Sequence, residues 1–158
     1  MDRQSGILRQ VYNSRIIIDT APRITVAFVN GFCAATDLVI PTILDEMSAN
    51  ATLNFLRQIR SLRPTLFPHL RLAGIVGNRT YHSEPGKFTD REQNSIARIR
   101  EMASSVYGHG DHFMDRCNIA DRADIAVAAG RKLAYFEKTE SRAMFLALAE
   151  EIQRRTIR

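Results

Sequence analysis

The chain has 158 residues, enough to bury the core of one domain. Hydrophobic residues make up 45% and charged residues 25%, a composition that excludes disordered and low-complexity chains. No apolar run approaches the roughly 20 residues that cross a bilayer, and the polar start Met1-Asp2-Arg3-Gln4 lacks the apolar core of a signal peptide. We therefore expect a single cytoplasmic domain over residues 1–158.

The charge balance favours an anionic partner. Lys+Arg exceeds Asp+Glu by 22 to 17, giving a formal net charge of +5 and a pI near 9.7. Arginine carries the excess, and its planar guanidinium suits phosphate oxygens. A solvated charged surface would give the same composition. The cysteines Cys33 and Cys117 are far apart in the sequence, and we expect two buried thiols rather than a disulfide.

Three short apolar runs, rich in β-branched residues, occupy residues 15–19, 37–41 and 72–76. Each run ends in polar or turn residues and lacks polar alternation. Continuous apolar character is typical of strands buried on both faces, as in a parallel sheet with helices on each side. The runs therefore predict three parallel strands.

Two helices are expected between these runs. Residues 24–35 are nearly all apolar or small, which favours a helix packed closely on the sheet. Residues 46–63 predict a second helix that ends before Pro64. Its predicted apolar face consists of Met47, Ala51, Phe55, Ile59 and Leu62, and a basic stripe on another face consists of Arg57, Arg60 and Arg63.

The second half of the chain continues the alternation. Thr89 to Glu92 has the spacing of a capping box, and the helix that follows has Ile96, Ile99, Ala103 and Val106 on its apolar face. Residues 121–129 and 141–155 predict further helices, the last with Met144, Leu148 and Ile152 inward, and residues 133–136 a short strand. This order predicts a doubly wound α/β fold with a mostly parallel sheet.

Ligands of open α/β sheets bind beyond the carboxyl ends of the strands. The residues there are Asp19 and Thr20 after the first run, Pro41 at the end of the second, and Asn78 and Arg79 after the third. An Asp-Thr pair also caps helices, and an Asn-Arg pair also makes turns.

The same segments resemble ParA/MinD-type partition ATPases from Tyr12 almost to the end of the chain. Tyr12 precedes Ile16-Ile17-Ile18-Asp19-Thr20-Ala21-Pro22, which is similar to the family's strand ending in Asp-Thr-Pro-Pro. Ala34-Ala35-Thr36-Asp37-Leu38-Val39-Ile40-Pro41 resembles its Ala-Asp strand with one inserted threonine. Gly74-Ile75-Val76-Gly77-Asn78-Arg79 resembles the strand whose trailing asparagine lies near the nucleotide base.

The resemblance implies a P-loop NTPase-like fold and an ATP-switched partition factor of chromosomes or plasmids that uses magnesium. Such a protein dimerises on nucleotide, binds the DNA backbone non-specifically on the nucleoid, and acts with a centromere-binding partner protein. It implies that Asp19 organises magnesium or the attacking water, that Thr20 and Pro22 form a nucleotide-sensing switch, and that Asn78, with Arg79 and Pro41, lies at the nucleotide. The implied DNA contacts are Arg122, Arg131, Lys132, Lys138 and Arg142.

The sequence departs from the family in one decisive respect. No glycine-rich, lysine-containing phosphate loop is present, and the Gly86-Lys87 pair has no glycine at the required earlier position. We expect a carboxyl-terminal part of the family fold that lacks its first strand, hydrolyses no ATP alone and binds neither ATP nor magnesium tightly. The missing strand should leave a gap, or force the strand over residues 15–19 against that over 37–41.

Three alternatives remain open. In one alternative, the chain is a non-catalytic interaction module or remnant. In another, it is a MinD-like membrane-associated protein in which the amphipathic residues 143–152 contact the bilayer. Packing of that helix on the core is the competing explanation, and it favours a protein without a membrane partner. His109, Asp111, His112, Asp115 and Cys117 could supply metal ligands, although their spacing fits no standard zinc site.

Overall fold

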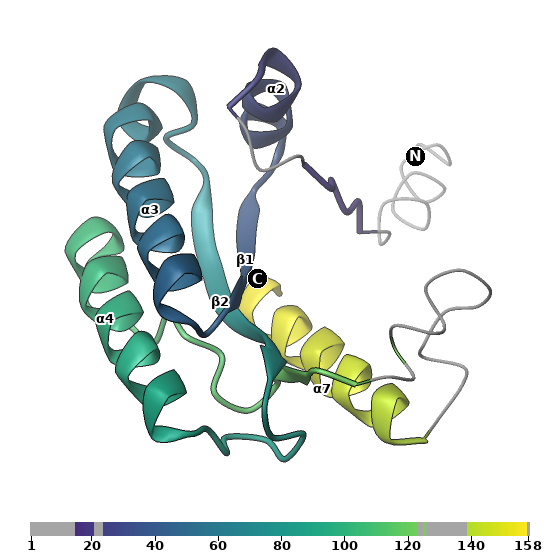
Figure 1. Cartoon of the computed structure of the whole chain (residues 1–158). Helices are drawn as coiled ribbons and strands as arrows, with labels where there is room; N and C mark the ends of the chain where they lie inside the picture. The colour runs from purple at the N-terminus through teal and green to yellow at the C-terminus, as the bar shows by residue number, and fades with distance from the viewer. Residues whose placement is uncertain (1–14, 21–23, 123–124, 126–138, 158) are drawn as a thin grey trace, which may run out of the picture. The chain divides into compact units, whose positions relative to one another are not determined.

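The computed structural model describes residues 15–20, 24–122, 125 and 139–157. The chain divides into two compact units, Met1–Ala35 and Thr36–Arg158. The first contains α2 (Val26–Ala34). The second contains β1 (Asp37–Ile43), α3 (Glu46–Leu66), β2 (Arg71–Thr80), α4 (Asp90–Tyr107), β3 (Ile119–Ala120) and α7 (Thr139–Thr156) (Figure 1).

The second unit is built on a parallel sheet of three strands in the order β1-β2-β3. The strands predicted over residues 37–41 and 72–76 are confirmed as β1 and β2, each longer than expected. The short strand β3 was not predicted. Because α3 and α4 connect successive parallel strands, the sheet consists of βαβ units.

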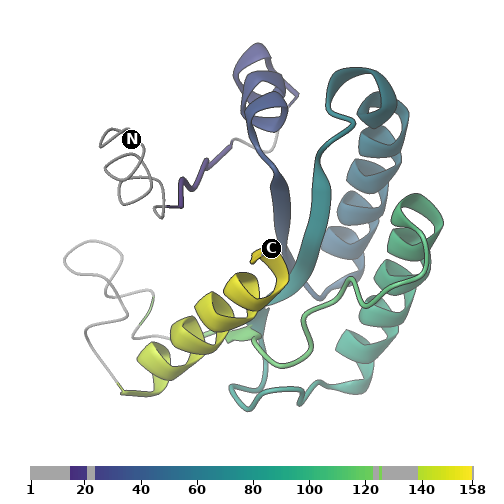
Figure 2. The ribbon, with the colours of Figure 1, turned by 180° about the vertical axis from the view of Figure 1, so that it is seen from behind.

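Helices cover both faces of this sheet. In Figures 1 and 2, α3 and α4 lie on one face and α7 lies on the other. Ile40 and Ile75 pack with the α3 and α4 side chains Leu56 and Ile99. On the opposite face, α7 packs against Val76 through residues that include Leu148 and Ile152. The predicted α/β class, with a parallel sheet flanked by helices, is confirmed.

Helix α3 differs from its prediction in the face that it buries. Met47 is 82% exposed and Ala51 is exposed, so the predicted apolar face is wrong at both, and of its members only Ile59 is fully buried. The buried stripe is Ala49, Thr52, Leu53, Leu56 and Ile59. Both sets recur at helical spacing, so the spacing alone does not decide which of them packs on the sheet.

The predicted end of α3 before Pro64 is also wrong, since the helix continues to Leu66. A proline in the last turn removes one N–H donor, but the backbone N–H of Phe67 still bonds to the carbonyl of Arg63 at 3.2 Å. Phe67 is fully buried and anchors the end of the helix.

Helices α4 and α7 follow their predictions. The capping box of Thr89 and Glu92 is present, Ile96, Ile99 and Ala103 are buried, and Val106 is partly buried. In α7, Met144 is buried, and Leu148 and Ile152 pack on the core. The apolar face of this helix is therefore used in packing, as the alternative to membrane contact predicted. Within the described ranges, no helix combines the length and hydropathy needed to cross a membrane.

In the first unit, the helix expected within residues 24–35 is confirmed as α2, and the strand over residues 15–19 is not found. Residues 15–20 belong to no strand, and Ile16 and Ile17 are 88% and 92% exposed. A strand exists only where its backbone pairs with a neighbour, and these residues have no strand partner among those described. A Cβ on Gly31 would lie 3.3 Å from Ile18 Cγ2 and from Thr20 Cγ2, so this segment packs on α2.

Of the two cysteines, only Cys117 is buried as predicted. Cys117 is buried beside Val76 and Met114, and burial raises the pKa of its thiol to about 11. Cys33 is exposed, because α2 buries the face that carries Phe28 and Phe32, whose rings stack at 4.1 Å.

β1 lies at one edge of the sheet that the structure describes. β1 pairs with β2 along one side, and its other side has no strand partner in the part of the chain that the structure describes. A missing strand was expected either to leave a gap or to bring residues 15–19 against residues 37–41. Among the described residues, 15–19 form no strand and do not pair with β1. The structure predicted for residues 121–129 and 133–136 falls almost wholly outside the described residues.

Candidate functional site

The carboxyl ends of all three strands meet at one edge of the sheet because the strands are parallel. The register places Asn78 of β2 between Ile43 of β1 and Ile119 of β3. Helices α3 and α4 begin just beyond this edge, so their positive N-terminal ends face the same region. This carboxyl edge is the candidate site.

Asn78 and Arg79 lie near the end of β2, where the register of β2 against β3 shifts. Arg79 has φ 54°, the left-handed region that few residues other than glycine adopt, and Asn78 Oδ1 accepts a hydrogen bond from the Arg79 backbone N–H at 3.0 Å. That bond fixes the side-chain oxygen of Asn78. Its Nδ2 group makes no hydrogen bond within the described ranges, so two donors remain for a ligand.

Arg79 extends toward the residue that follows β3. Its Nη2 lies 3.0 Å from Asp121 Oδ2, and the hydrogen bond to Asp121 raises the pKa of the Arg79 guanidinium. Both side chains are more than half exposed, and an ion pair this exposed contributes little stability. A ligand could therefore displace the pair at small cost.

A buried polar group supports the loop after β2. Asn118 Nδ2 donates to Thr80 Oγ1 at 2.9 Å and to the carbonyl of His82 at 2.8 Å, and Thr80 Oγ1 donates to the same carbonyl at 2.9 Å. Asn118 is 2% exposed, and its Oδ1 has no hydrogen-bond partner in the described structure. Sequence reasoning missed Thr80 and Asn118, because only the pairing of β3 with β2 brings them together.

Glu92 ties the start of α4 to the same loop. Its Oε1 accepts from the Tyr81 backbone N–H at 2.9 Å, and its Oε2 accepts from the Thr89 backbone N–H at 2.8 Å. Burial by itself raises the pKa of Glu92, but the hydrogen bonds from Thr89 and Tyr81 outweigh burial and the pKa is lowered. The ionised carboxylate thus fixes the loop at neutral pH.

At the end of β1, threonine and aspartate side chains order the entry into α3. Thr42 and Thr52 share a buried hydrogen bond of 2.8 Å. Asp45 caps α3 by accepting from the Ser48 backbone N–H at 2.6 Å, and that bond lowers the pKa of Asp45. Pro41 is exposed within β1, two residues before its end, and pairs with Val76.

The structure therefore brings together only some of the predicted site residues. Pro41, Asn78 and Arg79 lie in the second unit, on β1 and β2. Asp19 and Thr20 lie in the first unit, where Asp19 is exposed and Thr20 is half-buried against α2. Pro22 lies outside the described residues.

Two of the predicted DNA-contacting residues can be located. Arg122 Nη1 forms an ion pair with Glu140 Oε2 at 2.5 Å, and only 21% of the Arg122 side chain is exposed. Arg142 is exposed on α7. Arg131, Lys132 and Lys138 lie outside the described residues.

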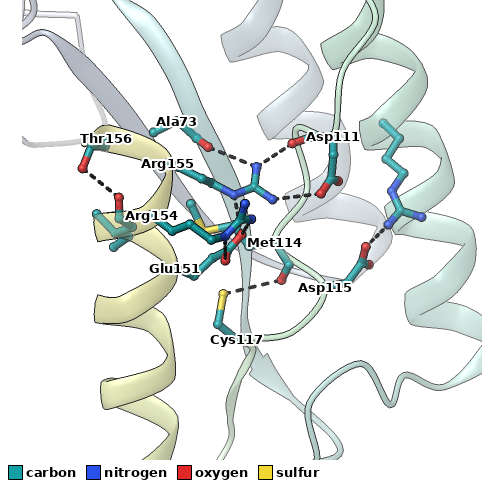
Figure 3. A network of polar contacts seen from close by, with 11 residues as sticks. Ala73, Asp111, Met114, Asp115, Cys117, Glu151, Arg154, Arg155 and Thr156 are labelled. Atoms are coloured by element: carbon teal, nitrogen blue, oxygen red, sulfur yellow. Dashed lines mark hydrogen bonds and ion pairs between the residues drawn. The ribbon is translucent and has the colours of Figure 1, made fainter. Parts of the chain in front are cut away.

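Most of the residues considered as metal ligands make other contacts. Across the described ranges, no group of three or more metal-ligating side chains gathers. His112 Nε2 contacts the carbonyl of Gly108 at 2.9 Å, and Asp111 Oδ2 is 2.9 Å from Arg155 Nη2. The Cys117 thiol donates to the Met114 carbonyl (Figure 3).

The opposite end of β2 is held by an ionic clamp from α7. Arg155 reaches from α7 to the carbonyl of Ala73 at 3.2 Å and to both the carbonyl and the carboxylate of Asp111 (Figure 3). The Glu151 carboxylate accepts hydrogen bonds from both Arg154 and Arg155. These bonds lower the pKa of Glu151 to about 2, and the bond from Arg154 has the larger effect. The Arg155 and Glu151 side chains are only 12% and 18% exposed and pair with each other, so the clamp joins α7 to the sheet.

No family model and no curated protein matches this chain.

Proposed function

We propose that this chain is part of a ParA/MinD-type partition ATPase and that its carboxyl edge binds the nucleotide base. The observation that carries the proposal is the hydrogen bond from the Arg79 backbone N–H to Asn78 Oδ1, which leaves the Asn78 amide donors open at the carboxyl end of the central strand. The ordered likeness of residues 12–41 and 74–79 to the family supports it. In this proposal the parent protein is an ATP- and magnesium-dependent dimer that acts on nucleoid DNA with a centromere-binding partner.

The chemistry of the edge suits an adenine base. Ring nitrogens of adenine accept hydrogen bonds, which the Asn78 Nδ2 group would donate, and the carboxylate of Asp121 would accept from the exocyclic amine. The segment next to Asn78, residues 80–82, is held by hydrogen bonds to Glu92 and Asn118 before any ligand arrives. A site already in its binding geometry has less conformational entropy to lose on binding.

The same proposal limits what these 158 residues do alone. They contain no glycine-rich loop whose backbone N–H groups would hold phosphates. We therefore propose a non-catalytic base-binding module: ATP should bind no more tightly than adenosine, magnesium should not strengthen binding, and no hydrolysis should exceed background.

Titration of the isotopically labelled chain by NMR tests the proposal. Adenosine and ATP should shift the backbone resonances of Asn78, Arg79 and Asp121 with equal, weak affinity. The variant Asn78→Asp keeps an oxygen for the Arg79 N–H and removes the amide donors, so it should abolish these shifts. Asn94→Ala, an exposed change on α4, is the matched control and should leave them intact.

Two results would contradict the proposal. The first is an adenosine response that Asn78→Asp leaves unchanged, and the second is a response to guanosine as strong as that to adenosine. Clear ATP turnover by the purified chain would sink the non-catalytic part alone.

A further inference from the structure

The backbone of Ile75 shows which residues of β2 bond to β1. Its N–H donates to the carbonyl of His112 at 2.7 Å, and its carbonyl accepts from the N–H of Met114 at 2.8 Å. Both groups are thus used on the side of β2 that lies away from β1. Since successive residues of a strand direct their backbone groups to opposite sides, the neighbours Gly74 and Val76 bond to β1.

The outer side of β1, which faces away from β2, follows from that pattern. Val39 and Pro41 lie opposite Gly74 and Val76, and in a parallel ladder such residues direct their own backbone groups to the other side. Pro41 has no N–H there, and a proline within a strand is tolerated where its nitrogen faces an edge of the sheet. Among the described residues no strand pairs with this side. The outer side therefore presents backbone groups that a further strand could bind.

The side chains of β1 are apolar on both faces of the sheet and are incompletely covered. Leu38 packs on the face of α3 and α4, Val39 packs on the face of α7, and each is only partly buried. A strand that paired with the outer side of β1 would extend both apolar layers at once. Such a strand is apolar at successive residues rather than at alternate ones.

Residues 15–19 have that character. Ile16, Ile17 and Ile18 are successive β-branched residues and are 88%, 92% and 44% exposed. Branching at Cβ favours extended backbone, and aliphatic side chains in water favour association. These residues have no strand partner among those described. The segment and the outer side of β1 therefore lack the same kind of contact.

We propose that residues 15–19 of one copy of the chain pair in parallel with the outer side of β1 of a second copy. Within one copy the segment is not paired with β1, so a second copy supplies the partner strand. The exchange is reciprocal and closes on two copies, because each copy gives one segment and receives one. This contact goes beyond the proposed function, since it is made by backbone groups of β1 and requires no ATP.

The apolar residues select one register. With Ile17 opposite Val39, the N–H of Val39 donates to the carbonyl of Ile16, and the carbonyl of Val39 accepts from the N–H of Ile18. This register also sets Asp19 opposite Pro41. The ladder then ends where the apolar run ends, at the residue of β1 that has no N–H.

Sedimentation equilibrium of the purified chain without nucleotide tests the association. A ladder this short is a small interface, so we expect a dissociation constant on the order of 100 µM and a monomer at about 1 µM. Ile17→Lys should raise the constant about ten-fold or more, because a charge would enter the apolar layers. Val26→Lys is the matched control: it changes an aliphatic residue that is 78% exposed outside the segment, and the constant should change less than about two-fold.

Disulfide capture tests the register between two copies. One chain carries Ile17→Cys and the other carries Val39→Cys and an affinity tag. Both carry Cys33→Ser, which removes the exposed cysteine, and both keep the buried Cys117. Neighbouring strands are about 4.8 Å apart, within the reach of a disulfide. Mild oxidation should give about ten-fold more of the covalent pair of unlike chains than a mixture of Ile17→Cys with Gln58→Cys, an exposed position on α3.

Several results would overturn the inference. They are a chain that stays monomeric at about 1 mM, equal weakening by Ile17→Lys and Val26→Lys, and equal capture at Val39 and Gln58. A chain with both Ile17→Cys and Val39→Cys that closes the disulfide within one copy would also overturn it. A dimer that forms only with ATP would contradict the exchange and leave the proposed function intact.

Discussion

Two segments of this chain have similar composition and opposite structures. Ile16-Ile17-Ile18 and Leu38-Val39-Ile40 are both apolar, β-branched runs that end in polar or turn residues. The second forms β1 and pairs with β2 over its whole length, whereas the first belongs to no strand and exposes 92% of Ile17. The difference shows that strand propensity is expressed only where a partner strand satisfies the backbone.

The largest expected effect separates the two segments by stability. Ile75 on β2 is fully buried between the layers, so Ile75→Ala should lower the free energy of unfolding by about 2–5 kcal/mol, the cost of an unfilled cavity. Ile17→Ala removes a side chain that is already in water and should change it by less than about 0.5 kcal/mol. Urea unfolding of both variants measures the contrast. Equal effects would mean that residues 16–18 are buried in a sheet after all.

The clamp of α7 should give the next largest effect. Arg155 contacts the carbonyl of Ala73 on β2 and both oxygen groups of Asp111 with a side chain only 12% exposed. Arg155→Ala leaves a buried carbonyl and a carboxylate without their donor, at a cost of about 2 kcal/mol. Arg154→Ala is the control, since its side chain is 68% exposed and should cost less than about 1 kcal/mol. Thermal unfolding of the two variants compares them, and equal destabilisation would show that the bonds to Ala73 and Asp111 do not stabilise the sheet.

Acid should weaken the same clamp. The pKa of Glu151 falls from 4.5 to about 2 because Arg154, and then Arg155, hydrogen-bond its carboxylate. A carboxyl group with a lowered folded-state pKa stabilises the fold above its unfolded pKa and loses that contribution as it protonates. The melting temperature of the unaltered chain should therefore fall more steeply than that of Glu151→Gln as the pH drops from 4.5 toward 2. Parallel curves would show that Glu151 is not coupled to folding.

What the sequence predicted well was local or strongly periodic. The capping box at Thr89 and the buried face of α4 depend on residues close in the chain, and both are present. The buried face of α3 could not be chosen from its sequence, since two stripes had similar spacing and only the sheet decides between them. The strand predicted over residues 15–19 was wrong because strand pairing is non-local and the sequence of a run does not name its partner.

The candidate site divides in the same way. Asn78 and Arg79 could be found because the end of an apolar run marks the end of a strand. The contact between Thr80 and Asn118 and that between Glu92 and Tyr81 could not be found, because they join residues 38 and 11 positions apart.

The smallest expected effect tests how firmly residues 18–20 are held against α2. Gly31→Ala should gain about 1 kcal/mol of helix propensity, offset by contacts of 3.3 Å with the Cγ2 atoms of Ile18 and Thr20, so the net change in unfolding free energy should be near zero. Gly74→Ala on β2 is the comparison. Its Cβ would lie 2.5 Å from Met114 Cε and 2.9 Å from Met114 Cγ, and it should cost about 1–3 kcal/mol through overpacking. A destabilisation at Gly31 as large as that at Gly74 would mean that residues 18–20 are fixed as rigidly as a strand of the sheet.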